Sequence, residues 1–329
     1  RQSNRASGSG SKRARRSLAT DHSPLTIQLT CHAIIAKLQR MSDSAEDFLE
    51  ALETAREENK LSSLRKGQLV TLPAEGEVWM TGDLHDHRNN LGKLIKAADL
   101  GNNPNRHLIL HEIIHGDHID PQGAEDSWVS LKKVAQLKCE FSDQVHLLLA
   151  NHDLAQVYGE GIMKAGLDVC DSFHRGLKRD FHEKYHFLEA AISEFLLSSP
   201  LAIRTQHGLW FSHSLPRESE IDTYDYGVFD RELTGEDYKR RTGAAYQLIW
   251  GRGATAYGAG RFAHKVGAKL IITGHQPQEM GYSINGEHHL IIASDHNQGV
   301  YIPLKLDHEY TMEEVTGRIK KFVALDITV

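Results

Sequence analysis

The sequence has little cysteine and no long hydrophobic run. Its three cysteines, Cys31, Cys139 and Cys170, are odd in number and widely spaced, so they do not resemble a disulfide framework. We therefore expect a reducing compartment and predict a cytoplasmic protein. No apolar stretch approaches the roughly 18 residues that a membrane-spanning helix needs. The hydrophobic segment of a signal peptide is missing as well, so no membrane partner is expected.

Acidic residues are missing from the first 20 positions, which carry six lysines and arginines. Because this Ser-, Gly- and Arg-rich start cannot bury a core, residues 1–23 are predicted to form a disordered basic tail. Contact of the tail with nucleic acid is the alternative to the favoured interpretation, a solvated tail. The overall composition, 40% hydrophobic and 25% charged, is typical of a globular protein. Residues 24–329 are predicted to form a single domain.

Apolar residues spaced by three and four predict several helices. Residues 24–66 are expected to form two leading helices that pack on the domain. A second apolar stripe, at 173–195, predicts a helical region with a core-facing side, which Pro200 ends. Thr311 and Glu314 are expected to cap a short helix near the end of the chain.

Six short apolar runs each lead to acids, amides or histidines. Buried strands that deliver polar side chains at their carboxyl ends are how open α/β sheets build sites. In the first of these endings, an extended Asp-x-His would place a carboxylate and an imidazole on the same side of the chain, as in a corner of a metal site. The runs are Val78–Met80 before Asp83 and His85, Leu108–Leu110 before Gly116 and Asp117, Val145–Leu149 before Asn151 and His152, Leu209–Phe211 before His213, Leu270–Ile272 before Gly274 and His275, and Leu290–Ile292 before Asp295 and His296.

A competing metal motif lies inside this series. His111-Glu112-Ile113-Ile114-His115 reads H-E-x-x-H, the pattern of zinc proteases. That pattern works only on a helix, where both histidines share one face. Here it continues a β-type run, in which the two histidines would be about 13 Å apart. A metalloprotease is therefore not favoured.

The order of the polar endings resembles that of the calcineurin-like metallophosphoesterases, and within them the PPP-type serine/threonine phosphoprotein phosphatases. The likeness runs from about residue 25 to residue 305. It implies an α/β fold of four layers, αββα, with the N-terminal helices added. It also implies hydrolysis of phosphomonoesters, with phosphoserine or phosphothreonine in proteins as the leading substrate. The matching motifs are Asp83-x-His85, Gly116-Asp117-x-Ile119-Asp120, Asn151-His152, His213-Ser214-Leu215-Pro216, Gly274-His275, and Leu248-Ile249-Trp250 ahead of Arg252.

The resemblance further implies two metal ions, manganese, iron or zinc, with a water between them as the nucleophile. His152 would protonate the leaving oxygen as a general acid, and Asp120 would orient it. Asp117 would bridge the two metals. The remaining ligands would be Asp83 and His85 for the first ion, and Asn151, His213 and His275 for the second.

Two departures from the family pattern concern the substrate phosphate. Pro121 and Leu149 stand where the family has phosphate-contacting arginines. Arg252 remains in roughly the place of a third arginine, and Arg88 could substitute for a lost one. The alternatives to a protein phosphatase are a small-molecule or nucleotide phosphoesterase and an inactive metal-binding regulatory module.

Overall fold

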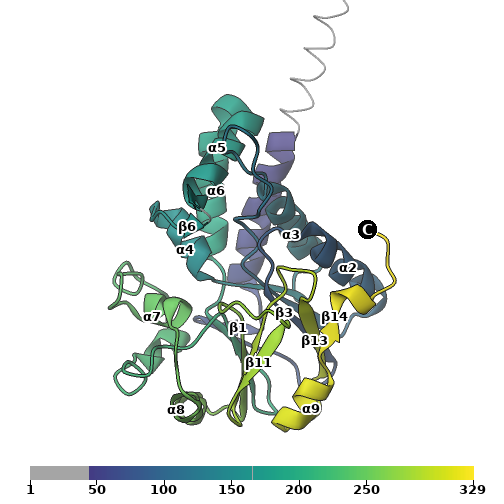
Figure 1. Cartoon of the computed structure of the whole chain (residues 1–329), viewed down its shortest axis with the longest axis vertical. Coiled ribbons are helices and arrows are strands. Elements are labelled where there is room, and N and C mark those ends of the chain that lie inside the picture. The colour runs from purple at the N-terminus through teal and green to yellow at the C-terminus, as the bar shows by residue number, and fades with distance from the viewer. Residues whose placement is uncertain (1–43, 165) are drawn as a thin grey trace, which may run out of the picture. The chain divides into compact units, whose positions relative to one another are not determined.

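Two β-sheets lie face to face between helices in the computed structural model, which describes residues 44–164 and 166–329 (Figure 1). The predictions for the basic tail and for the first leading helix lie outside the described residues. The five-stranded sheet has the order β14 (Lys320–Lys321), β13 (Val300–Lys305), β3 (Glu77–Asp83), β4 (Arg106–His111), β5 (Val145–Leu148). The seven-stranded sheet has the order β1 (Arg65–Lys66), β2 (Leu69–Thr71), β8 (Ala202–Arg204), β9 (Leu209–Ser212), β10 (Leu270–Thr273), β12 (His289–Ile292), β11 (Tyr282–Asn285).

All six apolar runs that were predicted to be strands form strands. They are neighbours in the sheets, where β3, β4 and β5 run parallel in one sheet and β9, β10 and β12 run parallel in the other. Parallel strands that are covered on both faces read as continuous apolar runs rather than as alternating patterns. In β4, for example, Leu108 and Leu110 face the helices, whereas Ile109 faces the opposite sheet.

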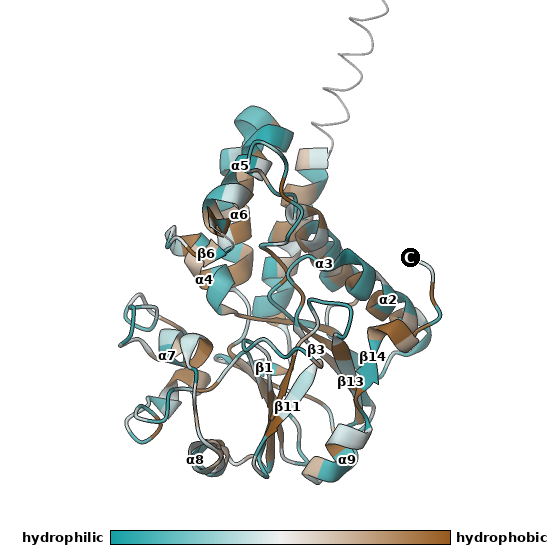
Figure 2. Ribbon diagram, viewed as in Figure 1, coloured by the Kyte–Doolittle hydropathy of each residue, from teal (hydrophilic) through white to brown (hydrophobic). Residues whose placement is uncertain are grey.

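Apolar side chains from both sheets fill the space between them. Met80 of β3 and Ile109 of β4 lie in one cluster with Phe211 of β9 and Ile272 of β10, and all four are fully buried. Figure 2 shows brown, hydrophobic colouring on strands such as β13, whereas α3 and α5 show teal, polar residues. The sheets therefore form the two inner layers of the unit.

Helices cover the outer face of each sheet. The five-stranded sheet packs against a helix that covers 44–61 and against α2, α3, α5 and α6, while the seven-stranded sheet packs against α7 and α8. These layers confirm the predicted αββα architecture. The helices are α2 (Arg88–Ala98), α3 (Trp128–Glu140), α4 (Asn151–Tyr158), α5 (Val169–Phe181), α6 (Tyr185–Leu197), α7 (Ala244–Trp250), α8 (Ala256–Val266) and α9 (Met312–Gly317), with short 3₁₀ turns at Leu100–Asn102, His182–Lys184, Tyr226–Asp230 and Phe322–Ala324.

Two helix predictions can be compared in detail. Thr311 and Glu314 form a reciprocal capping box at the start of α9, as expected. The predicted helical region at 173–195 is interrupted, because His182 has a positive φ of 48° and the chain turns there between α5 and α6. None of the helices in the described ranges is long and apolar enough to cross a membrane.

Candidate metal centre

The carboxyl ends of the parallel strands of both sheets deliver polar side chains to one place. Asp83 is the last residue of β3, and Glu112 follows β4 directly. Asn151 opens α4 just after β5. From the other sheet, His213 follows β9 and His275 comes two residues after β10. The site is therefore built where the two sheets meet.

Close backbone contacts join the two sheets at this point. The amide of Gly82 donates to the hydroxyl oxygen of Ser294 over 2.9 Å, and Asp83 forms a β-bridge with Ala293. A Cβ atom at Gly82 would lie 2.1 Å from the carbonyl oxygen of Ile292, and one at Gly274 would lie 2.4 Å from Oδ1 of Asp83. Only glycine fits at these two positions, because any side chain would push the sheets or the carboxylate apart.

Three residues of the site adopt left-handed backbone conformations. The φ angles of His85, Glu112 and His275 are 41°, 39° and 68°. Such conformations cost about 1–3 kcal/mol each for residues other than glycine and persist where the surrounding structure enforces them, often at functional sites. The expectation that Asp83 and His85 lie on one extended segment is wrong, because the chain turns at His85. The turn nevertheless brings the imidazole towards the strand ends.

Three side-chain atoms, two ring nitrogens and an amide oxygen, form a tight triangle at the strand ends in which hydrogens are crowded. Nε2 of His213 lies 2.7 Å from Oδ1 of Asn151 and 3.1 Å from Nδ1 of His275, which is itself 2.8 Å from the same oxygen. If both ring nitrogens carry hydrogens, these hydrogens face each other; if either lacks one, its lone pair faces the amide oxygen. If the side-chain amide of Asn151 is rotated so that its NH₂ group faces the rings, two unprotonated ring nitrogens would face each other with their lone pairs. A protonated ring nitrogen would instead face the hydrogens of the NH₂ group.

A cation resolves this conflict, because it accepts all three lone pairs at once. Two donors that are 2.0–2.1 Å from a metal and at right angles to each other are about 3.0 Å apart, close to the spacing of the triangle. Burial keeps both imidazoles in the neutral form that binds metals: it holds the pKa of His213 well below its usual range, and together with the charge of Arg252 it lowers the pKa of His275 to about 4.

Two buried carboxyl groups lie beside the triangle. Burial and then the charge of Asp83 raise the pKa of Glu112 well above its usual range. Burial alone would raise the pKa of Asp83 too, but the neighbouring His213 and a hydrogen bond with Glu112 hold it below its usual range. Two adjacent carboxyl groups that keep a proton between them form a place where a divalent cation can replace that proton.

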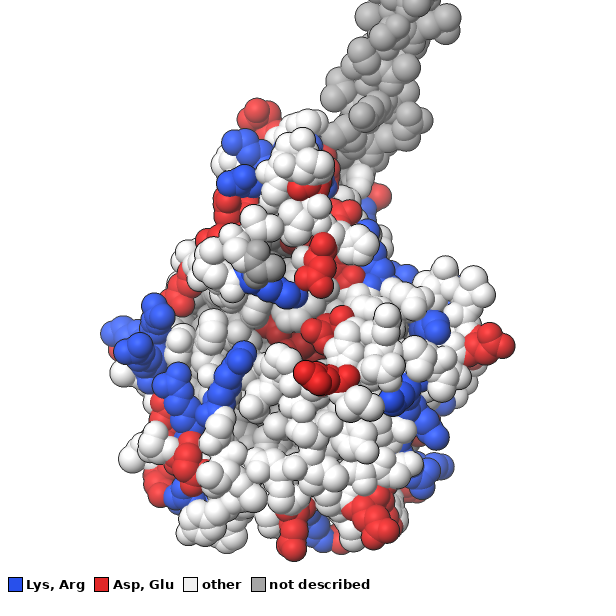
Figure 3. Space-filling model, in the orientation of Figure 1, with Lys and Arg blue, Asp and Glu red and all other residues white. Residues whose placement is uncertain are grey.

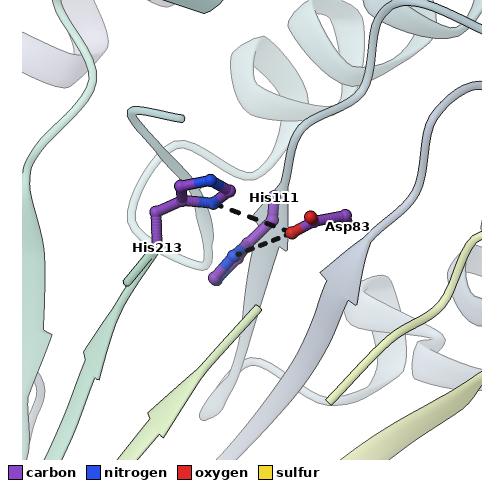
Figure 4. A group of neighbouring side chains, drawn as sticks. All are labelled: Asp83, His111 and His213. Atoms are coloured by element: carbon purple, nitrogen blue, oxygen red, sulfur yellow. Dashed lines mark ion pairs between the residues drawn. The ribbon is translucent and has the colours of Figure 1, made fainter. Parts of the chain in front are cut away.

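His111, the last residue of β4, lies next to Asp83, one of these two carboxyl groups. Its ring is fully buried, and in Figure 4 the dashed lines from the rings of His111 and His213 converge on the carboxylate of Asp83. Oδ1 of Asp83 lies 3.9 Å from Nδ1 of His111 and 3.7 Å from Nδ1 of His213. Neither of these ring nitrogens, nor Nε2 of His111, has a hydrogen-bond partner in the described part of the chain. Burial lowers the pKa of His111 to about 4, so its ring is neutral at neutral pH.

Glu112 lies in the central position that was predicted for Asp117. Oε2 of Glu112 lies 3.5 Å from Nε2 of His85 and 4.0 Å from Nε2 of His213, between the two groups of donors. The expected position of Asp117 at the centre is wrong. Its side chain is 81% exposed and pairs with Nζ of Lys164 at 2.9 Å. The reason is position along the chain, since Asp117 follows the end of β4 by six residues, whereas Glu112 follows it directly.

Asp120 is likewise displaced from its expected place beside His152. Its carboxylate accepts the backbone amides of Gln122 and Ala124, each at 2.9 Å, and pairs with Arg179 at 2.8 Å. Asp120 therefore stabilises a turn, and the prediction that it contacts His152 is wrong. The partner of His152 is a residue that the sequence analysis assigned only to the rejected zinc-protease motif.

That partner is His115. Nδ1 of His115 lies 2.9 Å from Nδ1 of His152, and Nε2 of His115 lies 2.8 Å from Oε1 of Gln156. Because the carboxamide oxygen of Gln156 only accepts, Nε2 of His115 donates to it, and Nδ1 of His115 accepts the Nδ1–H of His152. The five residues His111–His115 thus stand where Gly-Asp-x-Ile-Asp was expected. The signal that could have identified them is their place immediately after the strand.

The two arginines predicted to bind phosphate differ in their surroundings. Arg88 is engaged by carboxylates, with Asp86 at 2.9 Å and Asp126 at 2.6 Å, so its expected place in the phosphate site is wrong. Arg252 lies at the centre, where its Nε donates to Nε2 of His275 over 2.9 Å.

A cavity of about 400 Å³ opens above the centre. Asp83, His85, Glu112, Asn151, His152 and His275 line its floor, and Arg252, Lys164, Met163 and Asp295 are among the residues of its walls. The face drawn in Figure 3 shows acidic side chains near its centre with lysine and arginine side chains around them. Metal-dependent phosphate sites combine both features, cations bound by acidic groups and basic groups beside them.

The profile of the calcineurin-like phosphoesterase family matches residues 76–279, a range that contains all six residues of the cavity floor as well as His213. No curated protein has a sequence that matches the chain significantly.

A solved structure of a phosphatase has a similar fold. A protein serine/threonine phosphatase from Saccharomyces cerevisiae with similarity to human phosphatase PP5 superimposes with a TM-score of 0.62 and 14% identity, over 88% of this chain and 91% of that chain. At this identity the likeness concerns the fold alone. A cold-active protein-tyrosine phosphatase of a Shewanella species (TM-score 0.47, 14% identity, 80% and 85% covered) and a metallophosphoesterase from Sphaerobacter thermophilus (0.37, 11%, 74% and 92%) are more distant.

Proposed function

Because this chain belongs to the calcineurin-like phosphoesterase family and is thereby a metal-dependent phosphatase, we propose that it hydrolyses phosphomonoesters at a dinuclear metal centre. The donor triangle of His213, His275 and Asn151 carries this proposal, since a single cation would satisfy all three of its contacts at once. Together with the carboxylates of Asp83 and Glu112, the triangle gives a mixture of carboxylate, amide and imidazole donors that suits manganese, iron or zinc.

The residues divide into two sets that share one carboxylate. When bound, the two cations would polarise phosphoryl oxygens and lower the pKa of a coordinated water towards about 7. Glu112 belongs to both sets because it lies between His85 and His213. One set is Asp83, His85 and Glu112, and the other is Glu112, Asn151, His213 and His275.

His152 is the proposed general acid. It follows Asn151 directly and lines the cavity, so it is close to the centre and is not needed as a ligand. His115 and Gln156 keep the proton of neutral His152 on Nδ1, which leaves Nε2 to take up and deliver a proton. Burial, followed by the nearby His85 and His115, holds the pKa of His152 below its usual range in the protein without metals or substrate.

Arg252 is the proposed phosphate ligand from the chain. Its hydrogen bond to Nε2 of His275 requires that His275 carry its proton on Nδ1. A cation at Nδ1 requires the opposite tautomer, in which Nε2 is itself a donor. Cation binding therefore ends this hydrogen bond and makes the guanidinium available to a phosphate oxygen.

Phosphoserine or phosphothreonine in proteins is the proposed substrate class, and the order of the motifs supports it. The cytoplasm is the proposed location, which is consistent with the free thiols of Cys139 and Cys170. A nucleotide or another small phosphorylated molecule is the alternative substrate, because the arginines missing at Pro121 and Leu149 alter the phosphate contacts.

A substrate screen tests this proposal. Phosphopeptides, nucleotides and an aryl phosphate would be offered to manganese-, iron- and zinc-loaded protein, with metal content measured on the same preparation and Glu112→Gln as the inactive control. We expect two metal ions per chain and the highest turnover with phosphopeptides. A preference for nucleotides would replace the substrate class, and two bound metals without any turnover would favour an inactive regulatory module.

A further inference from the structure

The cavity has a second basic group besides Arg252 that the family pattern does not assign. Lys164 lines the same cavity from the side of the short hairpin of β6 (Met163–Lys164) and β7 (Leu167–Asp168). We propose that Lys164 binds an oxygen of the substrate phosphate and thereby replaces one of the arginines missing at Pro121 and Leu149. This inference rests on the proposed phosphatase activity, because it names a further substrate contact at the same site.

The base of the hairpin is fixed by its neighbours. Met163 pairs with Asp168 in the hairpin, and the amide of Val169, the first residue of α5, donates to the carbonyl oxygen of Ile162 over 3.0 Å. Asp168 in turn accepts the amide of Cys170 at 3.0 Å and so caps α5. The start of α5 therefore holds the strand that carries Lys164 beside the cavity.

The ion pair of Lys164 with Asp117 leaves the ammonium group available to a phosphate. Its Nζ pairs with Asp117 at 2.9 Å, and the two side chains are 39% and 81% exposed. An ion pair in contact with water contributes little to stability. A phosphate group offers three strong acceptor oxygens and up to two negative charges, so it competes effectively with a single exposed carboxylate for the ammonium group. Asp117 thus acts as a resting partner that the substrate displaces.

Other basic groups near the centre are already engaged. Arg88 is held by Asp86 and Asp126, and it does not line the cavity. Arg252 and Lys164 are the lysine and arginine side chains among the cavity-lining residues of the described chain. They therefore share the role that the missing arginines have in the resembling phosphatases.

Binding of inorganic phosphate provides a direct test. Isothermal titration of phosphate into manganese-loaded protein would compare the parent with Lys164→Gln, with Lys164→Arg, and with Lys239→Gln as the matched control. Lys239 also pairs with an exposed carboxylate, that of Glu236 at 2.6 Å, but it does not line the cavity. We expect Lys164→Gln to weaken phosphate binding by about tenfold, which is the typical worth of one charge-assisted contact. Lys164→Arg should restore most of the affinity, and Lys239→Gln should match the parent.

Asp117→Asn should have the opposite effect on phosphate affinity. Without the competing carboxylate, phosphate should bind more tightly than to the parent, and KM for an aryl phosphate should fall. Equal phosphate affinity and equal KM in the parent and Lys164→Gln would overturn the assignment while leaving the phosphatase proposal intact. A loss seen only with pyrophosphate or phosphopeptides would also overturn it, because Lys164 would then bind a group other than the reacting phosphate. A metal-loaded parent that hydrolyses no phosphoester would instead refute the proposed function.

Discussion

Two consecutive five-residue segments, His111–His115, which begins at the last residue of β4, and Gly116–Asp120, offer similar chemistry but have different places in the structure. Each has an acidic residue at its second position and a second titratable residue at its fifth. The first segment provides Glu112 to the metal centre and His115 to His152, whereas the second lies in an exposed turn. The comparison shows that distance from the strand end determines which side chains reach the centre, and similarity of letters does not.

Replacement of the second residue in each segment, Glu112 or Asp117, should give the largest difference in metal content and activity between the two segments. Glu112→Gln removes a carboxylate that lies between both sets of donors, so it should lower metal content at both positions. The activity should fall by more than about 1,000-fold, since metal contributions amount to several kcal/mol of barrier. Asp117→Asn should retain two metals and hydrolyse substrate. Metal analysis and turnover on both variants check this, and full metal content in Glu112→Gln would return the bridging role to another residue.

His152→Ala should have the next largest effect. General-acid catalysis typically contributes about 10²–10⁴-fold, so kcat should fall by that factor while metal content stays unchanged. A nitrophenyl phosphate, whose leaving group needs little protonation, should lose much less activity than an alkyl phosphate. Rates with a series of leaving groups provide the measurement. Equal losses across the series would argue against the acid role.

His115, the fifth residue of the first segment, should affect activity only through its contact with His152. His115→Ala removes the acceptor of the Nδ1–H of His152, and loss of such orienting partners typically costs about 10–100-fold in activity. His115→Asp, which offers a carboxylate oxygen as the acceptor for the same Nδ1–H, should recover much of the lost activity. Because burial could make either variant unstable, thermal unfolding of both would be measured beside kcat. An aspartate variant that is as stable as the alanine variant but no more active would show that His115 only fills space.

The two arginines that were predicted to bind phosphate can be compared directly. Arg252 lines the cavity, whereas Arg88 pairs with carboxylates outside it. Arg252→Lys loses the planar guanidinium that can hold two phosphate oxygens, so kcat/KM should fall by at least about tenfold. Arg88→Lys should leave kcat/KM unchanged, since Arg88 binds Asp86 and Asp126 outside the cavity. Steady-state kinetics with one phosphomonoester compare the two variants. Unchanged kinetics in Arg252→Lys would mean that the metals and other groups hold the phosphate.

The strands and layers could be predicted from the sequence because their signals are local. Runs such as Leu108–Leu110 are apolar on both faces, and each run indicates a buried parallel strand without knowledge of its neighbours. That Asp83, Asn151, His213 and His275 lie close together could be predicted for the same reason, since each follows such a run closely. The break at His182 carried no comparable signal, because the apolar spacing continues through it.

The bridging carboxylate and the partner of His152 could not be predicted as easily. Gly116–Asp120 matches the family letters, whereas His111–His115 matches a different motif, and only the end of β4 decides between them. The positive φ of Glu112, which lets its side chain turn from the strand to the centre, is not visible in the sequence. The engagement of Arg88 by Asp126 depends on the packing of α2 beside α3, which is a tertiary contact.

The smallest effect is expected for Asp120→Asn, at the fifth residue of the second segment. The amide of Ala124, and next Arg179, hold the pKa of Asp120 below its usual range, so the ionised carboxylate stabilises the folded state. This contribution is present above the unfolded-state pKa of about 3.9 and is lost as the pH falls through the lower folded-state value. Asparagine can still accept the turn amides, but it loses the charge that pairs with Arg179. Asp120→Asn should therefore lower the melting temperature slightly at pH 7, and the difference from the parent should shrink below pH 4, with kcat and metal content unchanged throughout. Thermal unfolding of metal-free protein across this pH range, together with turnover at pH 7, measures both. A fall in kcat comparable to that of His115→Ala would show that Asp120 reaches His152 after all, and the contrast between the two segments would fail.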